Sequence, residues 1–239
     1  MESSNIPFFV INLDSEIIRW NSVESEAELI KIKPIRVPAI NAKLLKKSNQ
    51  DLVTLGVKAA WQSHLTAIRI FLESKSESGL IIEDDFHIDN ASKFLNLIKD
   101  PKLKEFDLVQ IGFLKPGLDT RIKILFSNME ALIFRALGRI CKYSKFVELQ
   151  FGNRMRVKAY LNIPKGFVID DFQPGAHCYL ISKRFAGLIL NLNEPQFLSI
   201  DDFYIALSKM RSFSIIRLRK SIVSQNSFPA WIGSRFLRE

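Results

Sequence analysis

Gly79-Leu80-Ile81-Ile82-Glu83-Asp84-Asp85 is the stretch that decides the fold, because a wholly apolar run ends in three consecutive carboxylates. A short apolar run of this kind is typical of a buried strand. In α/β proteins the carboxyl ends of such strands border the ligand crevice. Adjacent carboxylates repel one another, and a divalent metal compensates two negative charges at once. The stretch therefore predicts a hard-metal site that holds a phosphorylated substrate.

Acids that follow a strand also have ordinary structural roles. They solubilise turns, and they cap the helix that comes next. Asp89 precedes the segment 90–95, whose apolar spacing is helical, and it is a candidate cap of this kind. Spacing alone leaves the turn and the metal site equally open.

The ten glycines form no phosphate-binding loop. They never fall into the spacing of a dinucleotide fingerprint or of a P-loop. A nucleotide bound by this chain would have to be held through a metal and through side chains, which makes the three carboxylates more important.

Composition and length are those of a folded globular protein. The chain has 239 residues, of which 47% are apolar, so we expect a single domain over residues 1–239. Its apolar runs are too short to cross a bilayer and its first residues are polar, so we expect a cytosolic protein. Cys141 and Cys178 match no zinc spacing, and we expect reduced thiols, with Cys178 buried.

The net charge of +9 is concentrated in one part of the chain. Residues 121–165 hold ten basic and two acidic residues, so we expect a basic, partly helical insert at 118–165. A capping box at 127–130 predicts a helix start, and three basic residues then recur at helical spacing opposite apolar ones. Such a helix lies on an anionic membrane surface or packs against its own domain. The insert lacks a nucleic-acid-binding motif, so we expect no nucleic acid partner. The three basic residues are Arg135, Arg139 and Lys142.

Apolar strand patterns alternate with helical periods along most of the chain. This alternation predicts an α/β sandwich with a mainly parallel central sheet flanked by helices. Asp14 or Ser15 is expected to cap the first helix. The expected strands are 7–13, 34–40, 79–85, 106–112, 175–181 and 213–218, and the expected helices are 15–32, 57–73, 91–99, 183–192 and one after Ser199.

Taken in order, several short segments resemble glycosyltransferase family 25, the bacterial lipooligosaccharide glycosyltransferases related to the collagen galactosyltransferases. The resemblance runs over most of the chain and rests on the order and separation of the motifs. In one departure, Val57 stands where the family usually has an acid. The motifs are Phe9-Val10-Ile11-Asn12-Leu13-Asp14 followed by Arg19, Arg36-Val37-Pro38-Ala39-Ile40-Asn41-Ala42, Leu55-Gly56, Ser63-His64, Ile82-Glu83-Asp84-Asp85, Gly175-Ala176-His177-Cys178-Tyr179-Leu180-Ile181-Ser182 and Ser199-Ile200-Asp201-Asp202-Phe203.

The resemblance implies a GT-A type nucleotide-sugar-binding fold, in which the acidic motif binds Mn²⁺ (or Mg²⁺) and, through it, a diphosphate. Asp85 is then the metal anchor, helped by Glu83 or Asp84. Because side chains alternate along a strand, we expect Glu83 and Asp85 on one face and Asp84 on the other. His177 is a further candidate metal ligand, although a histidine inside an apolar strand is more often a core residue.

Further residues are expected to contact the sugar-nucleotide donor. For His64, a core position satisfied by a backbone carbonyl is an equally good interpretation. The donor-binding candidates are Asn12, Arg19, His64, Glu83, Asp84, Gln110 and Gly112.

Members of this family are regarded as inverting enzymes, which need a base to take the proton from the acceptor hydroxyl. Two acidic pairs are candidates, Asp201-Asp202 and Asp170-Asp171. Ser199 and Asp202 have the spacing of a capping box, in which Asp201 is the acid left free. We therefore expect Asp201 to be the base, with Asp202 beside it.

The expected function is a metal-dependent transferase that moves a hexose to a lipooligosaccharide or to another glycan or glycolipid acceptor. UDP-galactose is the best candidate donor. The expected location is cytoplasmic, with peripheral contact to the inner face of the cell membrane.

Two other classes of protein remain as alternatives. A metal-dependent phosphohydrolase would use Glu83, Asp84, Asp85 and His87 as a compact ligand set. A non-catalytic basic module for membranes or nucleic acids would keep the acidic cluster as a structural feature, and salt would weaken its binding steeply.

Overall fold

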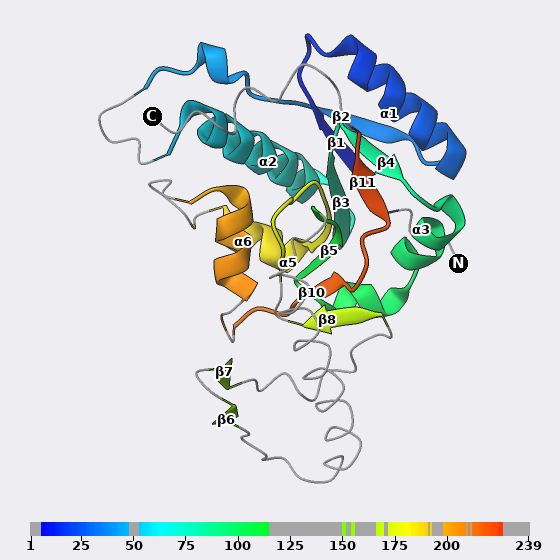
Figure 1. Cartoon of the computed structure of the whole chain (residues 1–239), viewed down its shortest axis with the longest axis vertical. Helices are drawn as coiled ribbons and strands as arrows, with labels where there is room; N and C mark the ends of the chain where they lie inside the picture. The colour runs from blue at the N-terminus through cyan, green and yellow to red at the C-terminus, as the bar shows by residue number, and fades with distance from the viewer. Residues whose placement is uncertain are drawn as a thin grey trace.

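The computed structural model describes residues 6–47, 53–114, 150–151, 154–155, 166–169, 172–190, 192, 198–208, 210 and 212–226. Nine strands within these residues form one curled, mixed sheet in the order β2-β1-β3-β9-β5-β10-β8, to which β11 and β4 are added beside β5 (Figure 1). Its strands are β1 (Phe8–Asn12), β2 (Pro34–Pro38), β3 (Ser78–Glu83), β4 (Phe86–Ile88), β5 (Leu108–Gly112), β8 (Phe167–Ile169), β9 (Cys178–Ser182), β10 (Ile215–Leu218) and β11 (Val223–Gln225).

Helices cover both faces of the sheet, as Figure 1 shows. α1 and α3 pack on one face, and α2, α5 and α6 pack on the other. The helices are α1 (Ile17–Ile30), α2 (Leu55–Glu73), α3 (Ala91–Ile98), α5 (Lys183–Ile189) and α6 (Ile200–Ser208), with short 3-10 turns η1 (Ala42–Leu44) and η2 (Pro101–Glu105). The α/β architecture expected from the alternation of patterns is confirmed.

The sheet lies between two apolar cores because its central strands are apolar on both faces. Along β1, Phe8 faces the core under α1 and α3, and Phe9 faces the core under α2, α5 and α6. β3 is apolar in the same way. Its one glycine, Gly79, leaves room for a helix, because a Cβ there would lie 2.7 Å from the ring of Phe71 in α2. α2 therefore packs close to β3.

The expectation of a mainly parallel sheet is wrong. Among the described strands, four pairings in this sheet are parallel and four are antiparallel. β9 is the main cause, since it lies between β3 and β5 and runs antiparallel to both. Its buried sequence, Cys178 to Ser182, shows that it is central but carries no sign of its direction.

Most expected elements have the expected type, and the corrections concern their ends. Neither Asp14 nor Ser15 caps α1, whose N-cap is Glu16 with no side-chain cap bond. α3 is capped by Asn90, whose side chain accepts a hydrogen bond from the Lys93 amide, and so Asp89 is not the cap. β4 and β11 were not expected from the sequence.

The basic insert lies largely outside the described residues. This holds for the capping box at 127–130, for Arg135, Arg139 and Lys142, and also for Asp170 and Asp171. Two short strands of the insert, β6 (Gln150–Phe151) and β7 (Arg154–Met155), pair antiparallel. Cys178 is a free, buried thiol, and burial raises its pKa. Within the described ranges no helix has both the length and the apolar character needed to span a bilayer.

Candidate functional site

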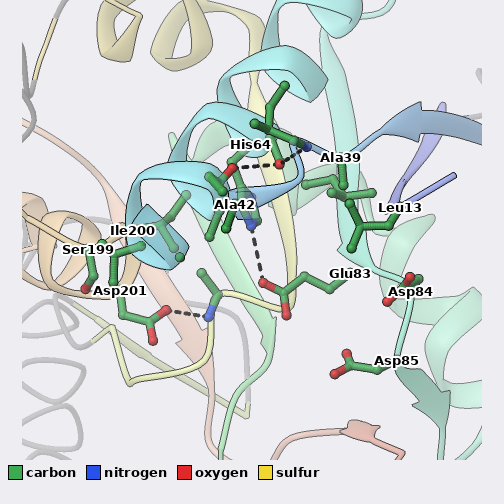
Figure 2. Close-up of a pocket in the computed structure, with 18 of the residues that line it drawn as sticks. Leu13, Ala39, Ala42, His64, Glu83, Asp84, Asp85, Ser199, Ile200 and Asp201 are labelled. Carbon is green, nitrogen blue, oxygen red and sulfur yellow. Dashed lines mark hydrogen bonds and ion pairs between the residues drawn. The ribbon is translucent and has the colours of Figure 1, made fainter. Parts of the chain in front are cut away.

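A cavity of about 550 Å³ lies where the parallel strands β1, β2 and β3 end. Its size is in the range of sites that hold a small organic ligand. Part of its wall is apolar, formed by the segments that follow β1 and β2 and by the first half of α2. The rest is polar and includes the three acids at the end of β3 (Figure 2). The cavity is lined by Ile11, Leu13, Arg19, Ala39, Ile40, Ala42, Thr54, Gly56, Val57, Ala59, Ala60, Ser63, His64, Glu83, Asp84, Asp85, Gly175, Ala176, Ser199, Ile200, Asp201 and Gln225.

The three acids form a turn rather than the end of a straight strand. β3 ends at Glu83, and Asp84 and Asp85 make the connection to β4. The side-chain amide of Gln225 donates to Glu83 Oε2 and to Asp85 Oδ1, at 3.4 Å in each case. These two carboxylates therefore share a partner, as expected for one face.

Asp84 has a different set of partners. Its Oδ2 accepts a hydrogen bond of 2.6 Å from Asn12, and its Oδ1 accepts one of 3.1 Å from Arg19. Asn12 is held in turn by Arg36, whose guanidinium donates to Asn12 Oδ1 at 2.6 and 2.9 Å. Asn12 thus orients Asp84 and is not itself among the residues that line the cavity. The expectation that Asp84 differs from its two neighbours is confirmed.

Burial and mutual repulsion raise the pKa values of the aspartates in this turn. The pKa of Asp85 rises to about 7, first because the group is buried and then because Glu83 and Asp84 are negative. Arg19 and the hydrogen bond from Gln225 oppose this rise. Burial also raises the pKa of Asp84, while Asn12 and Arg19 act to lower it. The turn therefore carries negative charge that a bound cation would compensate. Two of its acids, Glu83 and Asp85, share a neutral partner, the side-chain amide of Gln225.

His64 lies on the cavity wall at the middle of α2 and is buried. Its Nε2 lies 3.4 Å from Glu83 Oε1, and its Nδ1 lies 2.8 Å from the hydroxyl of Tyr179. Both ring nitrogens of His64 therefore contact side chains. The alternative interpretation, a core histidine satisfied by a backbone carbonyl, does not describe these contacts. Tyr179 in turn lies beside Tyr204, and burial raises the pKa of both phenols, so both stay protonated at neutral pH.

Asp201 lies across the cavity from the acidic turn, at the start of α6 (Figure 2). Its two carboxylate oxygens accept hydrogen bonds of 2.9 and 2.7 Å from the backbone amides of Gly175 and Ala176. Gly175 has φ 96°, a left-handed conformation that suits glycine. Asp201 is therefore the acid that the capping box leaves out, as expected, but its carboxylate also anchors the loop that forms this wall.

Asp202 has a structural role at the start of α6. The Ser199 hydroxyl accepts from the Asp202 amide at 3.1 Å and donates to the Asp202 carboxylate at 2.7 Å. Ser199 is thus the cap of α6, as expected. Asp202 is not among the residues that line the cavity.

Three further candidates lie behind the wall rather than on it. The side chain of Gln110 bonds to the backbone of Gln173 and Gly175 and so holds the loop that Asp201 anchors. Gly112 is in close contact with the next segment: a Cβ there would lie 2.8 Å from Cys178 and from the ring of His177. His177 is buried, and none of these three candidates is among the cavity-lining residues.

The carboxylates of the turn suit a hard divalent cation such as Mg²⁺. Within the part of the chain that the structure describes, no group of three or more His, Cys, Asp or Glu side chains is arranged to hold a metal ion. Glu83 and Asp85 nevertheless present two carboxylates to one partner. Mg²⁺ and similar hard ions are commonly held by one or two carboxylates, with substrate phosphates and water as the other ligands. The residues fit a cation of that kind, with Glu83 and Asp85 as its protein ligands and without His177.

The ligand set of the phosphohydrolase alternative is not brought together in the cavity. His87 Nδ1 lies 2.6 Å from Glu26 of α1, and Glu26 also accepts from the Ile88 amide. The His87 side chain is about half exposed and is not among the cavity-lining residues. His87 therefore joins β4 to α1.

Several residues of the site gave no signal in the sequence. Gln225 lies in the short strand β11, and Arg36 and Tyr179 lie inside segments quoted for other reasons. No protein-family model matches this chain, and no curated protein matches it. The chemistry of the cavity is therefore the basis for a proposal about function.

Proposed function

We propose that this chain is a glycosyltransferase with a GT-A type site, which transfers a hexose from a nucleotide sugar to a glycan or glycolipid acceptor. UDP-galactose is the first donor to test, and lipooligosaccharide is the first acceptor class, as the family 25 resemblance implies. One observation carries the proposal: the turn Glu83-Asp84-Asp85 forms one wall of a cavity of about 550 Å³ at the carboxyl ends of parallel strands. Ligands bind in α/β proteins at this edge of the sheet.

The two kinds of wall match the two parts of a nucleotide sugar. The acidic turn would hold the diphosphate together with Mn²⁺ or Mg²⁺, which supplies positive charge against the negative charge that develops on the departing nucleoside diphosphate. Glu83 and Asp85 would hold the cation. Arg19 lines the same cavity and adds positive charge beside the turn. The apolar wall, which includes Leu13, Ala39 and Ile40, suits the flat face of a nucleobase.

Asp201 is the proposed base for the acceptor. Its two oxygens accept hydrogen bonds from the backbone amides of Gly175 and Ala176, which fix the carboxylate on the cavity wall. In the transfer, the acceptor hydroxyl gives its proton to the Asp201 carboxylate while the hydroxyl oxygen of the acceptor bonds to the anomeric carbon of the donor sugar. The bond from that carbon to the diphosphate oxygen breaks at the same time, and the diphosphate keeps the electron pair. Asp201 lies across the cavity from the acidic turn, which leaves room for the sugar between them.

The basic segment carries a proposal about location. We place the enzyme at the cytoplasmic face of a membrane, with Arg135, Arg139 and Lys142 against anionic lipid. Vesicle sedimentation tests this placement with the triple glutamine variant, which should leave anionic vesicles at moderate salt. Undiminished sedimentation of the variant contradicts it.

A sugar-nucleotide panel tests the proposed function. Purified protein is incubated with UDP-galactose, UDP-glucose and other sugar nucleotides, with a lipooligosaccharide acceptor, and with either Mn²⁺ or a chelator. We expect sugar transfer with at least one donor, and loss of transfer with the chelator. Release of inorganic phosphate that needs no acceptor would favour the phosphohydrolase alternative instead.

A further inference from the structure

A series of buried hydrogen bonds runs from the cavity into the core behind it. It starts at Glu83 Oε1, which lies 3.4 Å from His64 Nε2, a contact drawn in Figure 2. His64 Nδ1 lies 2.8 Å from the Tyr179 hydroxyl, and that hydroxyl lies 3.4 Å from the hydroxyl of Tyr204. The four residues belong to β3, α2, β9 and α6, so the series joins four elements around one cavity.

Packing fixes the orientation of the His64 ring. The ring is 1% exposed, and both tyrosines are fully buried. It stacks on Tyr179 with 19° between the ring planes, and Tyr179 meets Tyr204 edge-on with ring centres 5.3 Å apart. A flipped ring would lose its contacts at both nitrogens. The positions of the hydrogens then follow from the donor and acceptor chemistry of the four side chains.

The hydrogens have one arrangement that serves every group. Ionised Glu83 can only accept, so the hydrogen between it and His64 is on Nε2. In the neutral ring Nδ1 is then an acceptor, and the hydrogen of the second bond comes from the Tyr179 hydroxyl. Tyr179 has then used its single hydrogen, and its oxygen accepts the hydrogen of Tyr204. In the opposite tautomer, a lone pair on Nε2 would face the carboxylate.

We infer that Tyr179 and Tyr204 are positioning residues that hold His64 in its Nε2–H tautomer, so that His64 presents a fixed N–H donor to Glu83. One oxygen of Glu83 is thereby held by His64, while the other is held by Gln225 beside Asp85. The carboxylate is oriented before a ligand arrives, which lowers the cost of binding and reaction. The catalytic consequence rests on the proposed function, whereas the tautomer is a property of the chain without ligand.

Nitrogen NMR of the ¹⁵N-histidine-labelled full chain tests the tautomer directly. The chain has three histidines, and the His64 signals are assigned by their loss in His64→Gln. In the wild type we expect a protonated Nε2 and an unprotonated Nδ1 at neutral pH. Because Glu83 remains in Tyr179→Phe, the Nε2–H form should stay the major one there, but the population of the other tautomer should rise, and it should rise less in Tyr204→Phe. His87 is the internal control, because its Nδ1 is held by Glu26, and its signals should stay unchanged.

The wild-type spectrum decides the inference even if the tyrosine variants fail to fold. A ring that carries its hydrogen on Nδ1, or on both nitrogens, overturns it. Tautomer populations of His64 that are the same in a folded Tyr179→Phe variant as in the wild type also overturn it.

Kinetics with a donor from the sugar-nucleotide panel separate positioning from mere structural support. We expect Tyr179→Phe to lower kcat about ten-fold or more and to change KM by less than about two-fold. A kcat equal to that of the wild type contradicts the positioning role. If the wild type transfers no sugar at all, the proposed function fails, and the NMR result still decides the tautomer.

Discussion

The side-chain amide of Gln225 donates a hydrogen bond of 3.4 Å to Asp85 Oδ1. The same nitrogen lies 3.4 Å from Glu83 Oε2, so one neutral amide lies within reach of two carboxylates on a cavity wall. A neutral donor compensates two negative charges only in part, and the raised pKa of Asp85, about 7, reflects this. The central claim is that a divalent cation and the diphosphate of a sugar nucleotide bind at this turn.

Asp85→Asn should stabilise the fold at alkaline pH. The pKa of Asp85 rises from 3.8 to about 7 on folding, so its protonation favours the folded state. This contribution is fully present below pH 3.8 and is lost as the pH rises towards 7. At pH 8 with chelator, we expect the variant to be more stable by about 1–3 kcal/mol, or several degrees in Tm. The gain should shrink as the pH falls to 5.

The control for Asp85→Asn is Glu28→Gln, which changes an exposed acid on α1. Its Tm should follow the wild type at both pH values. A loss of stability in Asp85→Asn that is equal at pH 5 and pH 8 would show that repulsion at the turn is not what the substitution relieves.

Asp84→Ala should destabilise the protein more than Asp14→Ala does. Asp84 is buried and accepts hydrogen bonds from Asn12 and Arg19, so its removal should cost about 2–4 kcal/mol. The Asp14 side chain is 82% exposed and contacts Arg36 at 3.6 Å, so its removal should cost less than about 1 kcal/mol. Urea denaturation measures both values. Equal costs for the two variants would contradict the structural role of the Asn12–Asp84–Arg19 group.

Gly112→Ala should destabilise, and Gly187→Ala should not. A Cβ on Gly112 would lie 2.8 Å from Cys178 and His177, both in the sheet's packed interior, whereas a Cβ on Gly187 meets nothing within 4 Å. Gly187 is inside α5, where alanine is the better helix former by up to about 1 kcal/mol. Thermal denaturation should give a fall in Tm of several degrees for the first variant and a small rise for the second. An unchanged Tm in Gly112→Ala would contradict this close packing.

Asp201→Asn should remove transfer, and Asp202→Asn should leave most of it. Loss of the proposed base should lower kcat about 10²–10⁴-fold. The variant also loses one of two acceptor oxygens for the Gly175 and Ala176 amides, so a Tm loss of a few degrees is expected with it. Asp202 bonds to Ser199 and is not among the residues that line the cavity, so its variant is the matched control. Comparable losses of kcat in the two variants would remove Asp201 from the role of base.

Hydrophobic pattern was sufficient to predict the type and approximate range of most elements. Val10 and Ile82 are apolar because β1 and β3 are buried on both faces, and that signal is local. The direction of β9 was not predictable in the same way, because a strand with antiparallel neighbours on both sides has the same buried composition. The three-residue strands β4 and β11 were missed because each is too short to show a period.

Part of the candidate site was also predicted from a local pattern in the sequence. Strand alternation predicted that Asp84 would be separated from Glu83 and Asp85, and the hydrogen bonds follow this division, although Asp84 and Asp85 lie in a turn after the end of β3. Partners far apart in sequence carry no local signal: Gln225 meets Asp85 across 140 residues, and Tyr179 meets His64 across 115. The anchoring contacts of Asp201 were not predicted, because its partners are backbone amides of a distant loop, which no side-chain pattern indicates.

The most direct test of the central claim is binding of UDP-galactose to the wild type and to Asp85→Ala, measured by calorimetry with Mn²⁺ and with chelator. We predict that the wild type binds the sugar nucleotide at least about ten-fold more tightly with Mn²⁺ than with chelator. In the variant this difference should be lost. Binding that is equally tight with and without the metal, or a metal dependence that survives in Asp85→Ala, would contradict a cation and diphosphate site at the turn Glu83-Asp84-Asp85.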